Sequence, residues 1–166
     1  MKVTALEEYG LRCMVLLAKR AESSGPVTLA EIGDHEGLSV AYAAKLLAIL
    51  RRAGLVSAVR GRNGGYVLSR SPEDIVLKEV IDALGEPVFS AAHCSRFTGV
   101  DSTCMHISNC SVRNVWRGFD KIIGRLLDRI TLADIITANY DVAETYSLSI
   151  EDTSQAASGI IRFARI

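Results

Sequence analysis

The chain has 166 residues, 49% of them hydrophobic and 23% charged, which is the size and composition of an ordinary globular domain. This composition excludes a disordered chain, a collagen-like repeat and a coiled coil throughout. No stretch is apolar enough for a membrane span, and Glu7 and Glu8 lie where a signal peptide would be apolar. We therefore expect a cytoplasmic protein that has no membrane partner.

The charges balance in total but not along the chain. Nineteen Lys and Arg offset nineteen Asp and Glu, yet residues 1–70 hold ten basic and six acidic side chains. The segment 39–70 contains no acidic residue, and its basic residues are Lys45, Arg51, Arg52, Arg60, Arg62 and Arg70. A charge run is often just a solvated face, so its meaning depends on the surrounding elements.

Three helices are predicted in the first third of the chain. Thr4 with Glu7, and Thr28 with Glu31, have the spacing of capping boxes, which place helix starts near residues 5 and 29. Ser39 is a suitable N-cap for a third helix, with Tyr42 and Lys45 facing outward. Its core-facing residues are expected to be Val40, Ala43, Leu46, Leu47 and Leu50. The second and third helices form a helix-turn-helix.

A β-hairpin with a basic tip is predicted next. Residues 55–59 and 66–68 are β-prone, and residues 60–65 between them contain three glycines and two arginines. A helix-turn-helix followed by a cationic hairpin is the plan of a winged helix, which places one helix in the major groove and the wing against DNA. A winged helix that binds only proteins is the alternative. The basic segment favours DNA, since phosphate contacts dominate affinity.

The C-terminal half predicts a second module. After a helix at about 77–84, an apolar stripe of Val115, Phe119, Ile122, Leu126 and Ile130 indicates a long helix. We expect a second copy of the chain to cover this stripe, although packing within one chain is the alternative. Thr131 and Asp134 indicate a short following helix that ends near Tyr140. The pattern of residues 141–166 shows no clear element.

The expected fold class is therefore mainly α with a small β-wing. Residues 1–84 form the winged helix-turn-helix DNA-binding domain, and residues 85–111 form a cysteine-containing loop. Residues 112–140 form the dimerisation helix with its short following helix, and residues 141–166 form a C-terminal tail. The sequence contains no G-x-S-x-G, P-loop or H-E-x-x-H motif, so we expect no enzyme.

The four cysteines are of two kinds. Cys13 lies in an apolar helical pattern, where a core role is favoured. Cys94, Cys104 and Cys110 lie within a polar loop and have no C-x-x-C spacing. An iron-sulfur cluster, a zinc ion and a thiol redox switch are all compatible with three such thiols.

Several motifs resemble those of the IscR-like, or Rrf-type, bacterial winged-helix regulators over about residues 1–140. The motifs are the opening residues 1–4 with 8–12, the G-L-V of 54–56, the R-G-x-x-G-G-Y of 60–66, the helix at 77–81 and the cysteine loop. This resemblance implies a homodimer that binds double-stranded DNA at a promoter operator. Many members of the family hold an iron-sulfur cluster with three cysteines of this loop, so the resemblance also implies such a cluster here.

Carried over by position, the resemblance makes Cys94, Cys104 and Cys110 the cluster ligands. Arg113 stands where the family pattern has a histidine ligand. In the nitric-oxide-sensing branch a carboxylate from the partner subunit takes the fourth place, and Glu8 stands at that position. The cluster, [2Fe–2S] or [4Fe–4S], is left undecided by the resemblance.

The DNA-binding residues follow from the same match and from the basic segment. The resemblance places Ser39, Tyr42 and Lys45 on the recognition helix and Arg60 in the wing, and the basic segment adds Arg51 and Arg62. Ala44 replaces a glutamate with which some relatives read bases.

The sequence thus predicts a DNA-binding transcriptional regulator that senses iron-sulfur status, redox state or nitric oxide through a cysteine-ligated cluster. One alternative is a cluster-free winged-helix regulator that uses zinc or thiol oxidation. Another, from a different class, is an iron-sulfur electron carrier.

Overall fold

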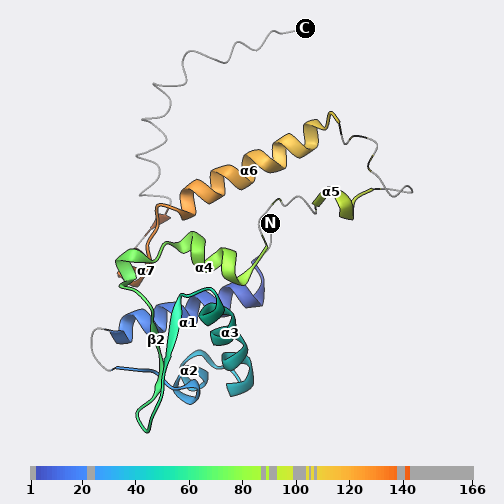
Figure 1. Cartoon of the computed structure of the whole chain (residues 1–166). Coiled ribbons are helices and arrows are strands. Elements are labelled where there is room, and N and C mark those ends of the chain that lie inside the picture. Colours follow the sequence, from blue (N-terminus) through green and yellow to red (C-terminus); the bar gives the residue numbers. More distant parts are fainter. Residues whose placement is uncertain are drawn as a thin grey trace. The chain divides into compact units, whose positions relative to one another are not determined.

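The computed structural model describes residues 3–21, 25–86, 89, 93–98, 104, 106, 108–137 and 141–142. Its elements are α1 (Ala5–Ala21), α2 (Leu29–Glu36), α3 (Val40–Arg52), β1 (Val56–Val59), β2 (Gly65–Leu68), η1 (Pro72–Asp74), α4 (Leu77–Leu84), α5 (His93–Arg96), α6 (Ser111–Leu127) and α7 (Leu132–Ile136) (Figure 1). This order confirms a mainly α fold with a small β-wing. The chain divides into two units, Met1–Ile136 and Thr137–Ile166. The predicted tail, apart from residues 141–142, lies outside the described residues.

Both capping boxes of the N-terminal helices form as predicted. The backbone N–H of Thr4 donates to Oε2 of Glu7 at 2.7 Å, and the Glu7 N–H donates to Oγ1 of Thr4 at 3.2 Å. The corresponding distances for Thr28 and Glu31 are 2.8 Å and 3.2 Å. These bonds satisfy free amide groups at each helix start, so the starts of α1 and α2 are determined locally.

The third helix, α3, is the second helix of the predicted helix-turn-helix. Its predicted N-cap is confirmed, because Oγ of Ser39 accepts the N–H of Tyr42 at 3.2 Å. Its fully buried residues are Ala43, Leu46, Leu47 and Leu50. The prediction that Val40 faces the core is wrong, since Val40 is 53% exposed. Val40 lies about two turns before Leu47 on the same side of the helix, beyond the part that the core covers.

The wing is an antiparallel hairpin of β1 and β2, in which Val56 pairs with Leu68 and Val59 pairs with Gly65. Tyr66 of β2 also exchanges two backbone hydrogen bonds with Val27. The N–H of Val27 donates to the Tyr66 carbonyl with a nitrogen-to-oxygen distance of 3.0 Å, and the N–H of Tyr66 donates to the Val27 carbonyl at 2.8 Å. At the tip, Gly61 has a φ of +117°, a conformation that L-residues rarely adopt. This hairpin confirms the wing that the glycine-rich segment predicted.

A short backbone junction joins the segment before α4 to the segment after α6. The N–H of Leu77 donates to the carbonyl of Ile130 at 2.7 Å, and the N–H of Leu132 donates to the carbonyl of Ile75 at 2.8 Å. The prediction that Ile130 belongs to an intersubunit stripe is wrong, because α6 ends at Leu127 and Ile130 is buried within its own chain. The helical spacing of the stripe does not reveal this break in the helix.

The last described helix, α7, completes the core of the winged domain. Thr131 and Asp134 form the predicted capping box, with Thr131 N–H to Asp134 Oδ2 at 2.8 Å. The helix ends at Ile136, and Tyr140, the predicted end, lies outside the described residues. Contacts with α1 and η1 place α7 against the N-terminal half of the chain. Residues predicted as part of the dimerisation module thus help to build the winged domain.

Helix α1 is the centre of this core and contacts α2, α3, α4, α7 and β2. Cys13 is fully buried there, and burial raises the pKa of its thiol to about 12. This is the core role that its apolar pattern predicted. Across the described helices, none has the length and apolarity that a membrane span requires.

Candidate nucleic-acid interface and cysteine loop

Five basic side chains of α3 and the wing face solvent. They are Lys45, Arg51, Arg52, Arg60 and Arg62, and all are exposed. Within the described part of the chain, the ion pairs involve other basic residues. These five charges are therefore available to an anionic partner at little cost in broken interactions.

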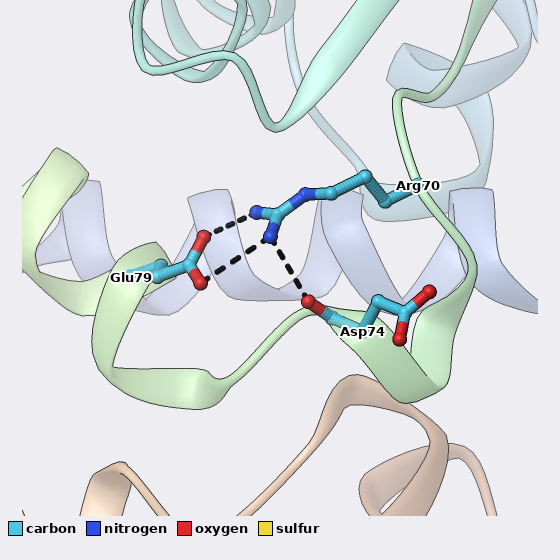
Figure 2. Close-up of polar contacts among 3 residues, drawn as sticks. All are labelled: Arg70, Asp74 and Glu79. Carbon is cyan, nitrogen blue, oxygen red and sulfur yellow. Dashed lines mark hydrogen bonds and ion pairs between the residues drawn. The ribbon is translucent and has the colours of Figure 1, made fainter.

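Arg70, the sixth basic residue of the segment, is already neutralised. Its guanidinium forms an ion pair with Glu79 of α4 and donates from Nη1 to the carbonyl of Asp74 at 3.0 Å (Figure 2). The hydrogen bond to Glu79, together with the negative charges of Glu79 and Asp74, raises the pKa of Arg70. The segment 39–70 thus contains no acidic residue, but in the folded chain Glu79, which lies outside this segment, pairs with Arg70 at its end.

The three residues predicted on the recognition helix have different environments. The Oγ of Ser39 is used as the helix cap, and Lys45 is exposed. The ring of Tyr42 is half-buried and packs edge-on against Tyr9 of α1, with centroids 6.1 Å apart. Val40, which we predicted to be buried, is exposed at the start of α3, on the side of the helix that faces the core further along. Its position in the first turn of α3 is the feature of the sequence that could have predicted this exposure.

The three loop cysteines are all free and half-buried. Cys94 lies in α5, Cys104 lies in the loop, and Cys110 is the N-cap residue of α6. Within the described ranges, no three His, Cys, Asp or Glu side chains lie close enough together to hold a metal ion. The three thiols thus share a loop but are not gathered into one site in this single subunit.

Cys110 and Arg113 are joined at the start of α6. The backbone N–H of Arg113 donates to Sγ of Cys110 at 3.3 Å. The Nε atom of Arg113 is buried and has no hydrogen-bond partner among the described residues. An unsatisfied buried donor costs about 1–3 kcal/mol, so a further acceptor at this place would be stabilising.

Glu8, the predicted fourth ligand, is engaged elsewhere. Its Oε1 accepts from Nε of Arg12 at 2.8 Å and from Nη2 at 2.7 Å, and this pairing raises the pKa of Arg12. Glu8 also lines a groove of about 320 Å³ with His35 and Ile135. The structure therefore pairs Glu8 with a guanidinium and does not place it in a common metal site with the cysteines described here.

Helix α6 exposes a row of large apolar side chains. They are Val112, Val115, Trp116, Phe119 and Ile122. The rings of Trp116 and Phe119 lie 6.0 Å apart on this face. Soluble proteins rarely leave such a contiguous apolar surface in water, so this face is suited to binding another protein surface.

Comparisons with known proteins bear on both modules. Residues 3–138 match the family model Rrf2, described as an iron-dependent transcriptional regulator. The HTH-type transcriptional regulator IscR of Yersinia pseudotuberculosis is 33% identical over 159 residues, which covers 96% of this chain and 93% of that protein. The IscR of Serratia proteamaculans is also 33% identical over the same length.

Solved structures show the same architecture. The IscR of T. potens has a TM-score of 0.64 and 31% identity, and the match covers 97% of this chain and 94% of that one. CymR, the global cysteine regulator of B. subtilis, has a TM-score of 0.61 and 28% identity over 82% of this chain and 96% of that one.

Proposed function

The chain belongs to the Rrf2 family of transcriptional regulators, and from this premise we propose how its two modules bind DNA and sense a signal. The first part of the proposal is that α3 enters the major groove while the wing lies along the backbone or minor groove. The candidate contacts are Ser39, Tyr42, Lys45, Arg51, Arg60 and Arg62. Five exposed basic residues without an ion pair in the described chain carry this part.

Selection of duplexes from a random double-stranded library tests DNA recognition when the operator is not known. The wild-type protein should enrich a common sequence and bind the enriched duplex at least about tenfold more tightly than a scrambled duplex of equal length. This threshold is low, because typical specific binding exceeds non-specific binding by far more than about tenfold. A library that stays unenriched, with equal affinities for both duplexes, would contradict sequence-specific binding.

The second part of the proposal is a homodimer that joins through α6. The exposed apolar row from Val112 to Ile122 supports it, because two copies of one face can cover each other about a two-fold axis. A symmetric dimer would also present two copies of α3, which suits an operator with paired half-sites.

The third part is an iron-sulfur cluster held by Cys94, Cys104 and Cys110. Three free thiols suit iron as donors, and the orphaned Nε of Arg113 beside Cys110 offers a hydrogen bond to a sulfur or another acceptor in this loop. When bound, the cluster would supply redox and nitric-oxide reactivity. The three cysteines would have to approach one another, because in the described chain they form no metal-binding group.

We assign the fourth ligand position to Glu8 of the partner subunit. A ligand from α1 of a second chain would link the cluster loop of one subunit to the winged domain of the other, so that cluster loss changes the spacing of the two recognition helices. To bind the cluster, Glu8 would first have to break its ion pair with Arg12. Glu8→Ala should leave the fold and the dimer intact but change the absorption spectrum of the cluster and uncouple DNA affinity from cluster state.

A cluster-free regulator that uses zinc or thiol oxidation is the second candidate. It is favoured by the separation of the three thiols in the described chain and by the likeness to CymR, a cysteine regulator. Anaerobic purification followed by visible absorption spectroscopy and analysis for iron, sulfide and zinc separates the two. Equal amounts of iron and sulfide with visible absorption support the cluster, whereas zinc or bare thiols support the alternative. Membership of a regulator family favours both over an electron carrier.

A further inference from the structure

Arg70 connects three parts of the chain at the base of the wing. Nη1 donates to the carbonyl of Asp74 at 3.0 Å and to Oε1 of Glu79 at 3.4 Å, and Nη2 donates to Oε2 of the same carboxylate (Figure 2). Asp74 ends η1 and Glu79 lies in the first turn of α4. One guanidinium thus joins the exit of the wing to η1 and to α4.

Both ends of this connection are firmly placed. Arg70 follows directly after Ser69, whose N–H donates to the carbonyl of Leu55 at 3.0 Å and closes the base of the hairpin. Helix α4 is anchored in the core by Val80 and Leu84, which are 0% and 3% exposed. The ion pair therefore fixes the base of the wing against a helix that cannot easily move.

The same contacts make Arg70 a poor phosphate ligand. Its charge is already matched by a carboxylate that binds it with two hydrogen bonds, a favourable geometry for an arginine pair. A phosphate oxygen would have to compete with Glu79 and with the carbonyl of Asp74. The exposed Arg60 and Arg62 at the tip have no such competitor in the described ion pairs.

We propose that Arg70 and Glu79 form a positioning pair that sets the angle of the wing, so that Arg60 and Arg62 reach DNA while Arg70 does not touch it. The inference rests on the proposed DNA-binding function. A strand of four residues is about 13 Å long, so a rotation of about 10° at the base moves the tip by about 2 Å. Such a displacement exceeds the tolerance of a hydrogen bond to phosphate.

The sign of the effect of Glu79→Ala on DNA affinity tests this proposal. Removing an acid from a protein that binds a polyanion should strengthen binding through electrostatics alone. The positioning role predicts the opposite, a loss of about two- to fivefold in affinity for the selected duplex, the range typical of a partly exposed pair. Asp82→Ala is the matched control, because it removes another acid from α4 that pairs with Lys78 and not with the wing. This control should leave affinity unchanged or slightly increased.

Charge reversal separates positioning from direct contact. Arg70→Glu alone should weaken binding, and the double variant Arg70→Glu with Glu79→Arg should recover most of the lost affinity by restoring the pair. A direct phosphate contact by Arg70 would not be recovered in this way. Thermal unfolding of each variant verifies that the fold is retained.

Three results would overturn the proposal. These are a Glu79→Ala protein that binds the duplex as tightly as the wild type or more tightly, a double variant no better than Arg70→Glu alone, and a wild-type protein that binds no DNA. The last result would overturn the proposed DNA binding as well, whereas the first two leave it standing.

Discussion

The Sγ atom of Cys110 accepts the backbone N–H of Arg113 at 3.3 Å, which makes the last cysteine of the loop also the N-cap of α6. The thiol of Cys110 is therefore both a proposed cluster ligand and the cap of α6, the helix that we expect to form the dimer. A change at this sulfur acts directly on the first turn of α6, and two substitutions can separate the two roles.

Replacement of Cys110 by Ser should preserve the helix and abolish the ligand. Serine is a preferred N-cap, whereas alanine loses the cap at a cost of about 0.5–2 kcal/mol. We therefore expect Cys110→Ser to unfold in urea at nearly the wild-type midpoint and Cys110→Ala to unfold earlier. Both variants should lose iron, because neither side chain supplies a thiolate. Retention of a full iron content by Cys110→Ala, whose side chain carries no donor atom, would exclude Cys110 as a ligand.

Replacement of Ile122 by Asp should dissociate the dimer without unfolding the subunit. Ile122 is 65% exposed in the single chain, so a carboxylate there is solvated in the monomer but would be buried without a partner in the dimer. Sedimentation velocity should show a monomer for this variant and a dimer for Lys121→Asp, a charge reversal at an exposed position on another side of α6. An intact Ile122→Asp dimer would exclude this face as the subunit interface.

Replacement of Arg60 by Ala should reduce the salt dependence of DNA binding. If the wing arginine contacts one phosphate, the slope of log affinity against log salt concentration should become less steep by about one unit. Fluorescence anisotropy at several salt concentrations measures this slope. Lys121→Ala removes an exposed charge from α6, outside the basic segment, and should leave the slope unchanged. Equal slopes for wild type and Arg60→Ala would remove Arg60 from the interface.

The capping box of α2 should make part of the stability depend on pH. Hydrogen bonds from the backbone and hydroxyl of Thr28 lower the pKa of Glu31 below its ordinary value. A carboxylate with a lowered pKa in the folded state stabilises the protein above its unfolded pKa, and this contribution disappears as the pH falls through its folded pKa. Glu31→Ala should thus be less stable than wild type near neutral pH. The difference, measured by urea unfolding, should shrink in acid; a difference independent of pH would contradict this role.

The parts of the fold that depend on neighbouring residues could be predicted from the sequence. The boxes at Thr4, Thr28 and Thr131 and the cap at Ser39 are formed by side chains three residues from their partners, so short-range chemistry determines them. The wing was predictable for a similar reason, because the turn at Gly61 needs a backbone conformation that favours glycine.

Features that depend on distant contacts could not be predicted in this way. Ile130 continues the helical spacing of α6, yet it lies beyond the end of that helix and is buried, and its carbonyl accepts the N–H of Leu77, far away in the sequence. Arg70 belongs to a basic run, but its partner Glu79 comes from the next helix. For the candidate site, the exposed wing arginines were predictable from composition. The relative positions of the three cysteines depend on how the loop and any partner subunit fold around a ligand, which residue spacing does not encode.

The backbone junction between Leu77 and Ile130 also gives the chain a topological division. The chain leaves the core after α4 and returns to it just before α7, and the junction ties this return to the start of α4, the helix that precedes the cysteine loop. An insertion of this kind can change in length or in chemistry while the body that holds it stays the same. A single winged scaffold could then carry different sensing segments in this place. Exchange of residues 86–128, together with the residue at position 8, between family members should transfer the proposed signal response while selection from a random duplex library still yields the same operator.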